Sequence, residues 1–146
     1  MDHNTLEQEI FINASLQEVW QLVSTPAWWV GDQGPDHVTV DGRRLVADCT
    51  YGRFPVLIED IEAPTTLVCR WASAHPGEEP IEGNSTLIAF HLRSENDGTR
   101  LSVREKGFAH LDVTEGQQVR SFKENIKGWE WQLNVIKQKA ESNLNT

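Results

Sequence analysis

The sequence predicts one α+β domain in which an antiparallel sheet packs against a long C-terminal helix. Three observations support this prediction. Apolar and polar residues alternate near the N-terminus, turn residues then divide the chain into short strand-like segments, and the last part of the chain has a helical spacing of apolar residues. The length of 146 residues is enough for a single domain over 1–146 to bury a core.

The first predicted elements are a strand and a short helix. Residues 6–14 alternate in polarity, as a half-buried strand does. Ser15 and Glu18 form a capping-box pattern, which predicts that a helix begins there, and Pro26 ends that helix. The segment 27–30 is predicted to form a second short helical turn before a glycine-bracketed loop.

Six further strands are predicted in the middle of the chain. They are 37–40, 44–51, 54–61, 66–73, 85–93 and 100–109. Asp41-Gly42 and Asp97-Gly98 are hairpin signals, because both residue types tolerate the positive φ of tight turns. The segment 74–84 is predicted to be an acidic loop, since its two prolines and its polarity are unfavourable for pairing in a sheet.

The last predicted element is a long helix that begins at a second capping box, from Thr114 to Gln117. Apolar residues then recur at spacings of three and four for roughly six turns. They are Val119, Phe122, Ile126, Trp129, Leu133 and Ile136. Because no second long helix is predicted, this stripe has only the sheet to pack against. Trp131 lies about 200° around the helix from Trp129, so one of the two is expected to face outward.

Composition and charge exclude several classes of partner. Thirteen basic and 22 acidic residues give a net charge of −9, and no local basic stripe offsets it, so no nucleic-acid partner is expected. No apolar run is long enough to span a membrane and no signal-peptide pattern opens the chain, which predicts a cytoplasmic protein. Cys49 and Cys69 are expected to be free thiols, because another strand lies between their predicted strands.

Short motifs along nearly the whole chain resemble a known family. They are Ile10-Phe11-Ile12-Asn13-Ala14-Ser15, Glu18-Val19-Trp20, Trp28-Trp29, Glu62-Ala63-Pro64 with Leu67, Arg70-Trp71, Gly98-Thr99-Arg100-Leu101, Glu105-Lys106-Gly107-Phe108 and Gly128-Trp129. Together with the order of strand, two short helices, six strands and long helix, they resemble the START-like helix-grip superfamily (SRPBCC). Within it, they resemble bacterial single-domain homologues of the activator of the ninety-kilodalton heat-shock-protein ATPase.

This resemblance implies a fold and a class of function. The fold is a curved seven-stranded antiparallel sheet wrapped around the C-terminal helix, with an apolar cavity between them. Related proteins use that cavity for lipids, sterols, polyketides or other small hydrophobic molecules, and a minority catalyse reactions in it. In the eukaryotic co-chaperone, a second domain makes much of the contact with the ATPase. The present sequence has no room for that domain, so chaperone contact is not expected from this resemblance.

Six tryptophans are the most unusual feature of the composition. Trp28, Trp71 and Trp129 are candidates to stack on a flat ligand, with ordinary core packing as the alternative for each.

Glu105 is the main ionisable candidate, because it shares a strand face with the apolar Leu101 and Val103. A carboxyl group buried on that face needs a partner or a raised pKa, and it suits either a polar handle for a ligand or a general base. Arg70 and Arg104 are its candidate partners. Alternation nevertheless places Arg70 outward if the following tryptophan points inward.

Motifs for other chemistries are not found in the sequence. The five histidines lack HxH and HExxH spacing, and His91 is expected on the solvent face of its strand. Neither a Gly-x-Ser-x-Gly elbow nor a phosphate-loop or dinucleotide fingerprint is present. We therefore predict no catalytic residue, no metal ligand and no cofactor.

The leading functional hypothesis is non-enzymatic binding of a small hydrophobic molecule, aromatic, lipid or polyketide-like, between the sheet and the last helix. The predicted ligand-binding residues are Trp28, Phe54, Trp71, Phe90, Glu105, Phe108, Phe122, Ile126 and Trp129. One alternative is an enzyme of polyketide-cyclase or hydrolase type with Glu105 as base. Another is a stress- or chaperone-associated interaction module. Aromatic residues at Trp28 and Trp29 are compatible with either a homodimer patch or the rim of the pocket.

Overall fold

The computed structural model describes residues 3–25, 28–30, 35–50 and 52–142, and its elements follow the predicted order. The strands are β1 (Thr5–Ile12), β2 (Val38–Asp41), β3 (Arg44–Cys49), β4 (Gly52–Glu62), β5 (Thr66–Trp71), β6 (Thr86–Glu95) and β7 (Gly98–Lys106). The helices are α1 (Leu16–Val23) and α2 (Glu115–Ser142), with short 3-10 turns η2 (Pro35–His37) and η3 (Phe108–His110). The predicted α+β helix-grip fold is confirmed.

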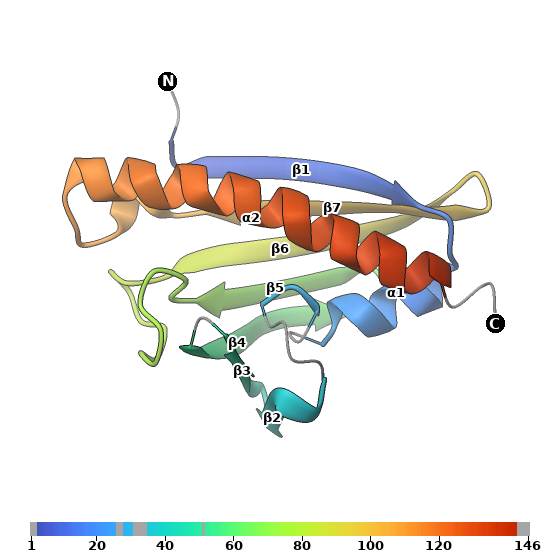
Figure 1. Ribbon diagram of the computed structural model, residues 1–146, viewed down its shortest axis with the longest axis horizontal. Helices are drawn as coiled ribbons and strands as arrows, with labels where there is room; N and C mark the ends of the chain where they lie inside the picture. Colours follow the sequence, from blue (N-terminus) through green and yellow to red (C-terminus); the bar gives the residue numbers. More distant parts are fainter. Residues whose placement is uncertain (1–2, 26–27, 31–34, 51, 143–146) are drawn as a thin grey trace.

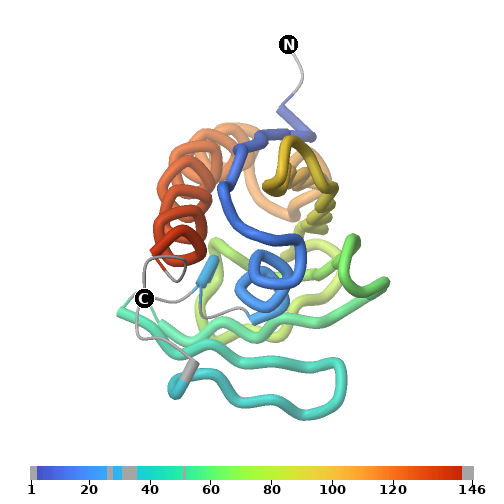
Figure 2. The backbone as a smooth tube through the Cα atoms, turned by 90° about the vertical axis from the view of Figure 1, so that its right-hand side faces the viewer, coloured from blue at the N-terminus to red at the C-terminus, as the bar shows by residue number. Residues whose placement is uncertain are grey.

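The seven strands form one antiparallel sheet in the order β1-β7-β6-β5-β4-β3-β2. The first strand therefore closes one edge by pairing with the last. The sheet curves, so that β1 lies beside α2 while the β2–β3 hairpin lies far from that helix (Figures 1 and 2). Sheets twist because of the handedness of their residues, and here the curved inner face encloses the helix. The core lies between this inner face and the two helices.

The start of α1 follows the capping prediction. The Ser15 hydroxyl accepts a hydrogen bond of 3.2 Å from the Glu18 amide, which satisfies one of the free donors at the helix start. The strand before it ends at Ile12 rather than at residue 14, because the Ala14 amide turns back onto the Ile12 carbonyl at 2.9 Å.

The second short helical turn, predicted at 27–30, lies partly outside the described residues. Within the described part, Trp28 has 3-10 geometry, and Trp29 and Val30 form a turn. The glycine-bracketed loop that was predicted to follow lies outside the described residues except for Pro35, which begins η2.

Both hairpins exist, but each turn is shifted by one residue from its sequence signal. The β2–β3 turn is Gly42-Arg43, with Gly42 at φ 61°. The β6–β7 turn is centred on Asn96 and Asp97, which have φ of 50° and 65°. Gly98 already pairs within the sheet. A Cβ at Gly98 would lie 2.6 Å from the Ile12 carbonyl oxygen, so this glycine permits close strand approach rather than a positive φ.

Three of the middle strands end earlier than predicted. The strand predicted at 44–51 ends at Cys49, and the one predicted at 66–73 ends at Trp71. The strand predicted at 100–109 ends at Lys106, because Gly107 adopts a φ of 109° and leads into η3. Cys49 and Cys69 lie on β3 and β5, which β4 separates, and both are free.

The long helix begins as predicted. The Gln117 amide donates to the Thr114 hydroxyl at 3.2 Å, and the Thr114 amide donates to the Gln117 side chain at 3.3 Å, so the capping box is reciprocal. The helix has 28 residues, about eight turns, and is longer than the predicted six. A Lys137–Glu141 ion pair, one turn apart, supports its last turns. No helix in the described ranges is both long enough and apolar enough to cross a membrane.

Helix α2 is attached to the edge strand β1 by polar contacts. Gln8 donates to the Ile126 carbonyl at 2.8 Å, and Lys137 donates to the Phe11 carbonyl at 3.0 Å. Trp129 is 2% exposed whereas Trp131 is 71% exposed, which confirms that the two tryptophans face in opposite directions.

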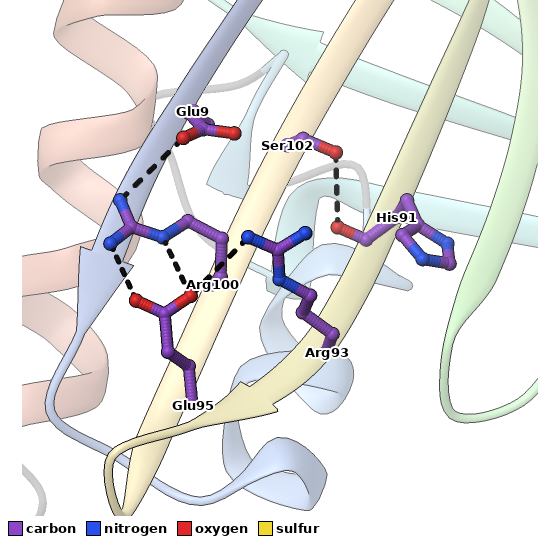
Figure 3. A network of polar contacts seen from close by, with 6 residues as sticks. All are labelled: Glu9, His91, Arg93, Glu95, Arg100 and Ser102. Carbon is purple, nitrogen blue, oxygen red and sulfur yellow. Dashed lines mark hydrogen bonds and ion pairs between the residues drawn. The ribbon is translucent and has the colours of Figure 1, made fainter.

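The outer face of the sheet is polar near the β6–β7 turn (Figure 3). Arg100 binds Glu95 at 2.7 Å and lies 3.8 Å from Glu9, while Arg93 lies 3.4 Å from Glu95. His91 is on this same face and is exposed, as predicted. Charged residues therefore cover this part of the solvent side of the sheet.

Candidate ligand-binding site

A buried acid lies where the sheet meets α2. Glu105 is on the inner face of β7, in line with Leu101 and Val103, and is 0% exposed. The strand alternation that puts these two apolar residues in the core also puts the carboxyl group there. The predicted inward orientation of Glu105 is correct.

Four side chains donate hydrogen bonds to Glu105. Its Oε1 accepts from the Trp129 indole at 2.7 Å, and its Oε2 accepts from the Trp71 indole at 2.8 Å and the Thr86 hydroxyl at 2.5 Å. The Asn125 amide group lies 3.1 Å from both oxygens. These donors come from β5, β6 and two successive turns of α2, so one carboxyl group joins three strands and the helix.

Burial and hydrogen bonding act on Glu105 in opposite directions. Removal from water raises the pKa of this carboxyl group, and the hydrogen bonds from Thr86, Trp129, Trp71 and Asn125 lower it. Burial is the larger effect, so the pKa lies above its ordinary value of 4.5.

The predicted arginine partners of Glu105 are wrong. Arg70 donates instead to Glu59 and Ser85, each at 3.0 Å. Arg104 pairs with Glu7 at 2.7 Å. The physical reason is strand alternation, because each arginine precedes or follows an inward residue and therefore points to the outer face. The carboxyl oxygens of Glu105 instead accept hydrogen bonds from neutral donors.

Four aromatic rings pack around the acid. Trp29 lies 5.7 Å from Trp71, 5.1 Å from Phe90 and 6.0 Å from Trp129, measured between ring centroids. Phe54 extends the cluster, 6.2 Å from Trp71. These separations are typical of favourable aromatic contacts. The rings fill the centre of the space between sheet and helix, where the resemblance implied one open cavity.

A pocket of about 490 Å³ remains beside this cluster. Three tryptophans, a phenylalanine and residues from the segment after β5 and from α2 surround it. The lining residues are Trp29, Val30, Phe54, Trp71, Ser73, Ala74, Pro76, Glu124, Asn125, Gly128, Trp129 and Gln132. Its size lies in the range of ~300–1,000 Å³ that is usual for small-molecule sites.

The structure brings some of the predicted site residues together and separates others. Phe54, Trp71 and Trp129 line the pocket, and Glu105 lies directly behind the two indoles. Phe90 is fully buried against Trp129 and does not reach the lining.

The remaining predicted residues lie elsewhere. Phe108 and Phe122 pack edge to face at 5.4 Å, away from the pocket lining. Ile126 is on the β1 side of α2, where its carbonyl accepts from Gln8. Trp28, which was expected near the mouth, lies outside the lining and holds the Lys139 ammonium 4.8 Å from its ring centroid.

Sequence reasoning missed several residues of the site. Trp29 was considered only for a homodimer patch or the rim of the pocket, yet it is 2% exposed and its indole donates to the Val23 carbonyl at 2.8 Å. Asn125 lies four residues before Trp129, a spacing that places two side chains on one helix face, and this signal was available. Gln132 lies three residues after Trp129 and carries the same signal. Ser73 carries none, because its place depends on how the segment after β5 folds back.

A larger hollow of about 800 Å³ lies at the outer side of the sheet. Its lining combines charges of both signs, including Arg70, Lys106, Glu82 and Asp112. No tryptophan, tyrosine or phenylalanine is among the described residues that line it. The described residues also hold no group of three or more His, Cys, Asp or Glu side chains placed to bind a metal. The aromatic pocket is therefore the better candidate site for an apolar ligand.

A curved seven-stranded antiparallel sheet closed by one long helix defines a helix-grip domain of the START-like class. The family model described as "Activator of Hsp90 ATPase homolog 1-like protein" matches residues 13–141. The chain belongs to this family. A comparison with curated proteins found no match.

Solved structures share the fold at low sequence identity. The solution structure of Bacillus halodurans protein BH1534 is 21% identical, with a TM-score of 0.67 over 94% of this chain and 99% of that one. The Aha1 dimer from Colwellia psychrerythraea is 19% identical, with a TM-score of 0.66 over 94% and 96%. DynU16, a putative protein in the dynemicin biosynthetic locus, is 19% identical with a TM-score of 0.66, over 96% of this chain and 48% of that one.

Proposed function

We propose that this protein binds a small, flat, predominantly apolar molecule in the pocket between the end of the sheet and α2. The observation that carries this proposal is the pocket itself, which is walled by Trp29, Phe54, Trp71 and Trp129 and has a volume of about 490 Å³. Aromatic walls with a few polar groups are typical of sites that bind and orient small molecules.

The surroundings of Glu105 favour binding over acid–base catalysis. A general base needs an accessible lone pair within hydrogen-bond distance of the proton that it removes. Both oxygens of Glu105 already accept indole N–H groups, and the side chain is fully buried behind Trp71 and Trp129. We therefore assign Glu105 to support of the pocket wall.

The structural neighbours are consistent with this proposal. DynU16 has the same fold and belongs to the dynemicin biosynthetic locus. A fold found in a protein of a small-molecule biosynthetic locus is compatible with a small-molecule site, although fold alone does not determine function.

Calorimetric titration with 1-naphthalenemethanol tests this proposal. This alcohol has a flat apolar ring system, and we expect saturable one-to-one binding. Gly128→Leu is the blocking variant, because Gly128 lines the pocket and a Cβ there has no neighbour within 4 Å. A leucine side chain therefore extends into open space at the pocket wall without displacing the backbone. We expect it to weaken binding at least about tenfold.

Gly116→Leu is the matched control. Gly116 also belongs to α2, and a Cβ added there would have no neighbour within 4 Å, but this residue does not line the aromatic pocket. Binding should be unchanged in this variant. The proposal is wrong if the unmodified protein shows no saturable binding of this alcohol or of its charged analogues with the same ring system, or if both leucine variants weaken binding equally.

A further inference from the structure

The tryptophans of the pocket have already used their hydrogen-bond donors. Trp71 and Trp129 both donate their N–H groups to Glu105, and Trp29 donates to the Val23 carbonyl. An indole has one donor and no acceptor. A ligand in the pocket therefore meets these three side chains through their ring carbons and π surfaces, which carry partial negative charge on their faces.

Asn125 offers the pocket an acceptor rather than a donor. Its amide NH₂ group donates to the Ser73 hydroxyl at 3.0 Å and to Glu105 at 3.1 Å. The opposite orientation would place the amide oxygen against the carboxyl oxygens of Glu105, which accept from two indoles and the Thr86 hydroxyl. Among the described residues, no side chain or backbone group donates to the side-chain oxygen of Asn125. That oxygen remains able to accept from a ligand.

Among the described residues that line the pocket, the charged side chain is an acid. Glu124 is part of the lining, and none of the described lining residues is Lys, Arg or His. The residues outside the described ranges contain no Lys, Arg or His in their sequence either. Arg120, Lys123 and Lys127 line a separate hollow on α2, of which Glu124 forms the shared boundary. Lys139, for its part, is held over Trp28, outside the lining.

We propose that this pocket prefers organic cations, namely protonated amines that carry an aromatic or compact apolar group, over neutral and anionic molecules of the same shape. This inference rests on the proposed function and names its ligand class. An ammonium group gains from the faces of aromatic rings, best of all tryptophan. In this pocket it also has the side-chain oxygen of Asn125 as a hydrogen-bond acceptor and the Glu124 carboxylate as an opposite charge.

Three ligands that share one ring system test the charge preference. They are 1-naphthylmethylamine, which is an ammonium ion at neutral pH, neutral 1-naphthalenemethanol, and anionic 1-naphthoate. Calorimetry should give a dissociation constant about tenfold lower for the amine than for the alcohol, in line with a partly desolvated cation–π contact. The naphthoate should bind more weakly than both.

A pair of helix variants localises the effect. Glu124→Gln should weaken binding of the amine about threefold, because the lost charge is on an exposed rim, and it should weaken binding of the alcohol less. Glu130→Gln removes the same charge from the same helix at an exposed position outside the pocket lining, and it should change neither ligand.

Each outcome supports or overturns the inference. If amine and alcohol bind equally, the cation preference is wrong while ligand binding stands. If none of the three compounds binds, the proposed function and the inference both fail. If Glu124→Gln and Glu130→Gln weaken amine binding to the same extent, the preference comes from the net charge of −9 and not from this pocket.

Discussion

Trp129 of α2 donates its indole N–H to Glu105 of β7 over 2.7 Å, so the long helix is attached to the sheet through a buried acid. Trp71 makes the equivalent contact from β5 at 2.8 Å. Burial of a carboxyl group without a charged partner is costly unless its lone pairs are satisfied. The two indoles therefore have two functions, since they satisfy the acid with their edges and form the wall of the pocket with their rings.

The first prediction concerns the contact between Trp129 and Glu105. Trp129→Phe removes the indole donor and leaves unfilled space in the core. We expect the free energy of unfolding to fall by about 2–4 kcal/mol. Trp131→Phe, two residues further along the same helix at an exposed position, should change it by less than about 0.5 kcal/mol. Urea unfolding followed by circular dichroism measures both. Equal losses in the two variants would show that the buried contact contributes little.

The second prediction concerns the pH dependence of stability. The pKa of Glu105 is raised in the folded protein, mainly by burial, above its ordinary value of 4.5. The folded state then binds more protons than the unfolded state between these two pKa values. The contribution of Glu105 to stability is therefore complete below pH 4.5 and declines as the pH rises toward the folded pKa. Glu105→Gln should abolish this decline in urea unfolding measured at a series of pH values.

Glu95 provides a comparison of opposite sign. Hydrogen bonds from Arg100 are the main cause that lowers the pKa of this carboxyl group below 4.5. Its stabilising effect is thus present above pH 4.5 and is lost as the pH falls through the folded pKa. Glu95→Gln should flatten the acid side of the stability profile and Glu105→Gln the side above pH 4.5. A Glu105→Gln profile parallel to that of the unmodified protein contradicts the assignment of the raised pKa.

The fold could be predicted from periodicity, because most segments of the chain show either the alternation of a strand or the three- and four-residue spacing of a helix. Alternation placed Glu105 inward together with Leu101 and Val103, and the helical stripe placed Trp129 inward. The two capping boxes located the starts of both helices correctly. Each of these signals lies within a short segment of the sequence, so it can be recognised without knowing the tertiary contacts.

The composition of the site depends on contacts that are not local. Glu105 was expected to have a partner or a raised pKa, with two arginines as candidate partners. Its pKa is raised, and its hydrogen-bond partners are instead tryptophan, threonine and asparagine side chains from three other elements. Trp29 enters the core from a turn, where no periodicity indicates its direction. The volume of the pocket could not be predicted from the sequence either, because it depends on how the rings of Trp29, Trp71 and Trp129 pack against one another.

The third prediction concerns the two thiols. Cys69 is 1% exposed, and burial raises the pKa of its thiol to about 12, so it has almost no thiolate at pH 8. Cys49 is half-buried. A Cys49→Ser variant should be inert to a thiol reagent until denaturant is added, whereas a Cys69→Ser variant should react in the native state. Rapid labelling of native Cys49→Ser protein, detected by mass spectrometry, would contradict the burial of Cys69.

The fourth prediction concerns the close approach of β7 to β1. A Cβ at Gly98 would lie 2.6 Å from the carbonyl oxygen of Ile12, which is backbone and cannot move without displacing β1. Gly98→Ala should therefore lower the free energy of unfolding by about 1–3 kcal/mol. Gly116→Ala is the control, because a Cβ there has no neighbour within 4 Å, and it should raise helix stability by up to about 1 kcal/mol. Chemical unfolding of both variants measures the difference. If Gly98→Ala is as stable as Gly116→Ala, the two strands have room to separate and this glycine is not needed for their approach.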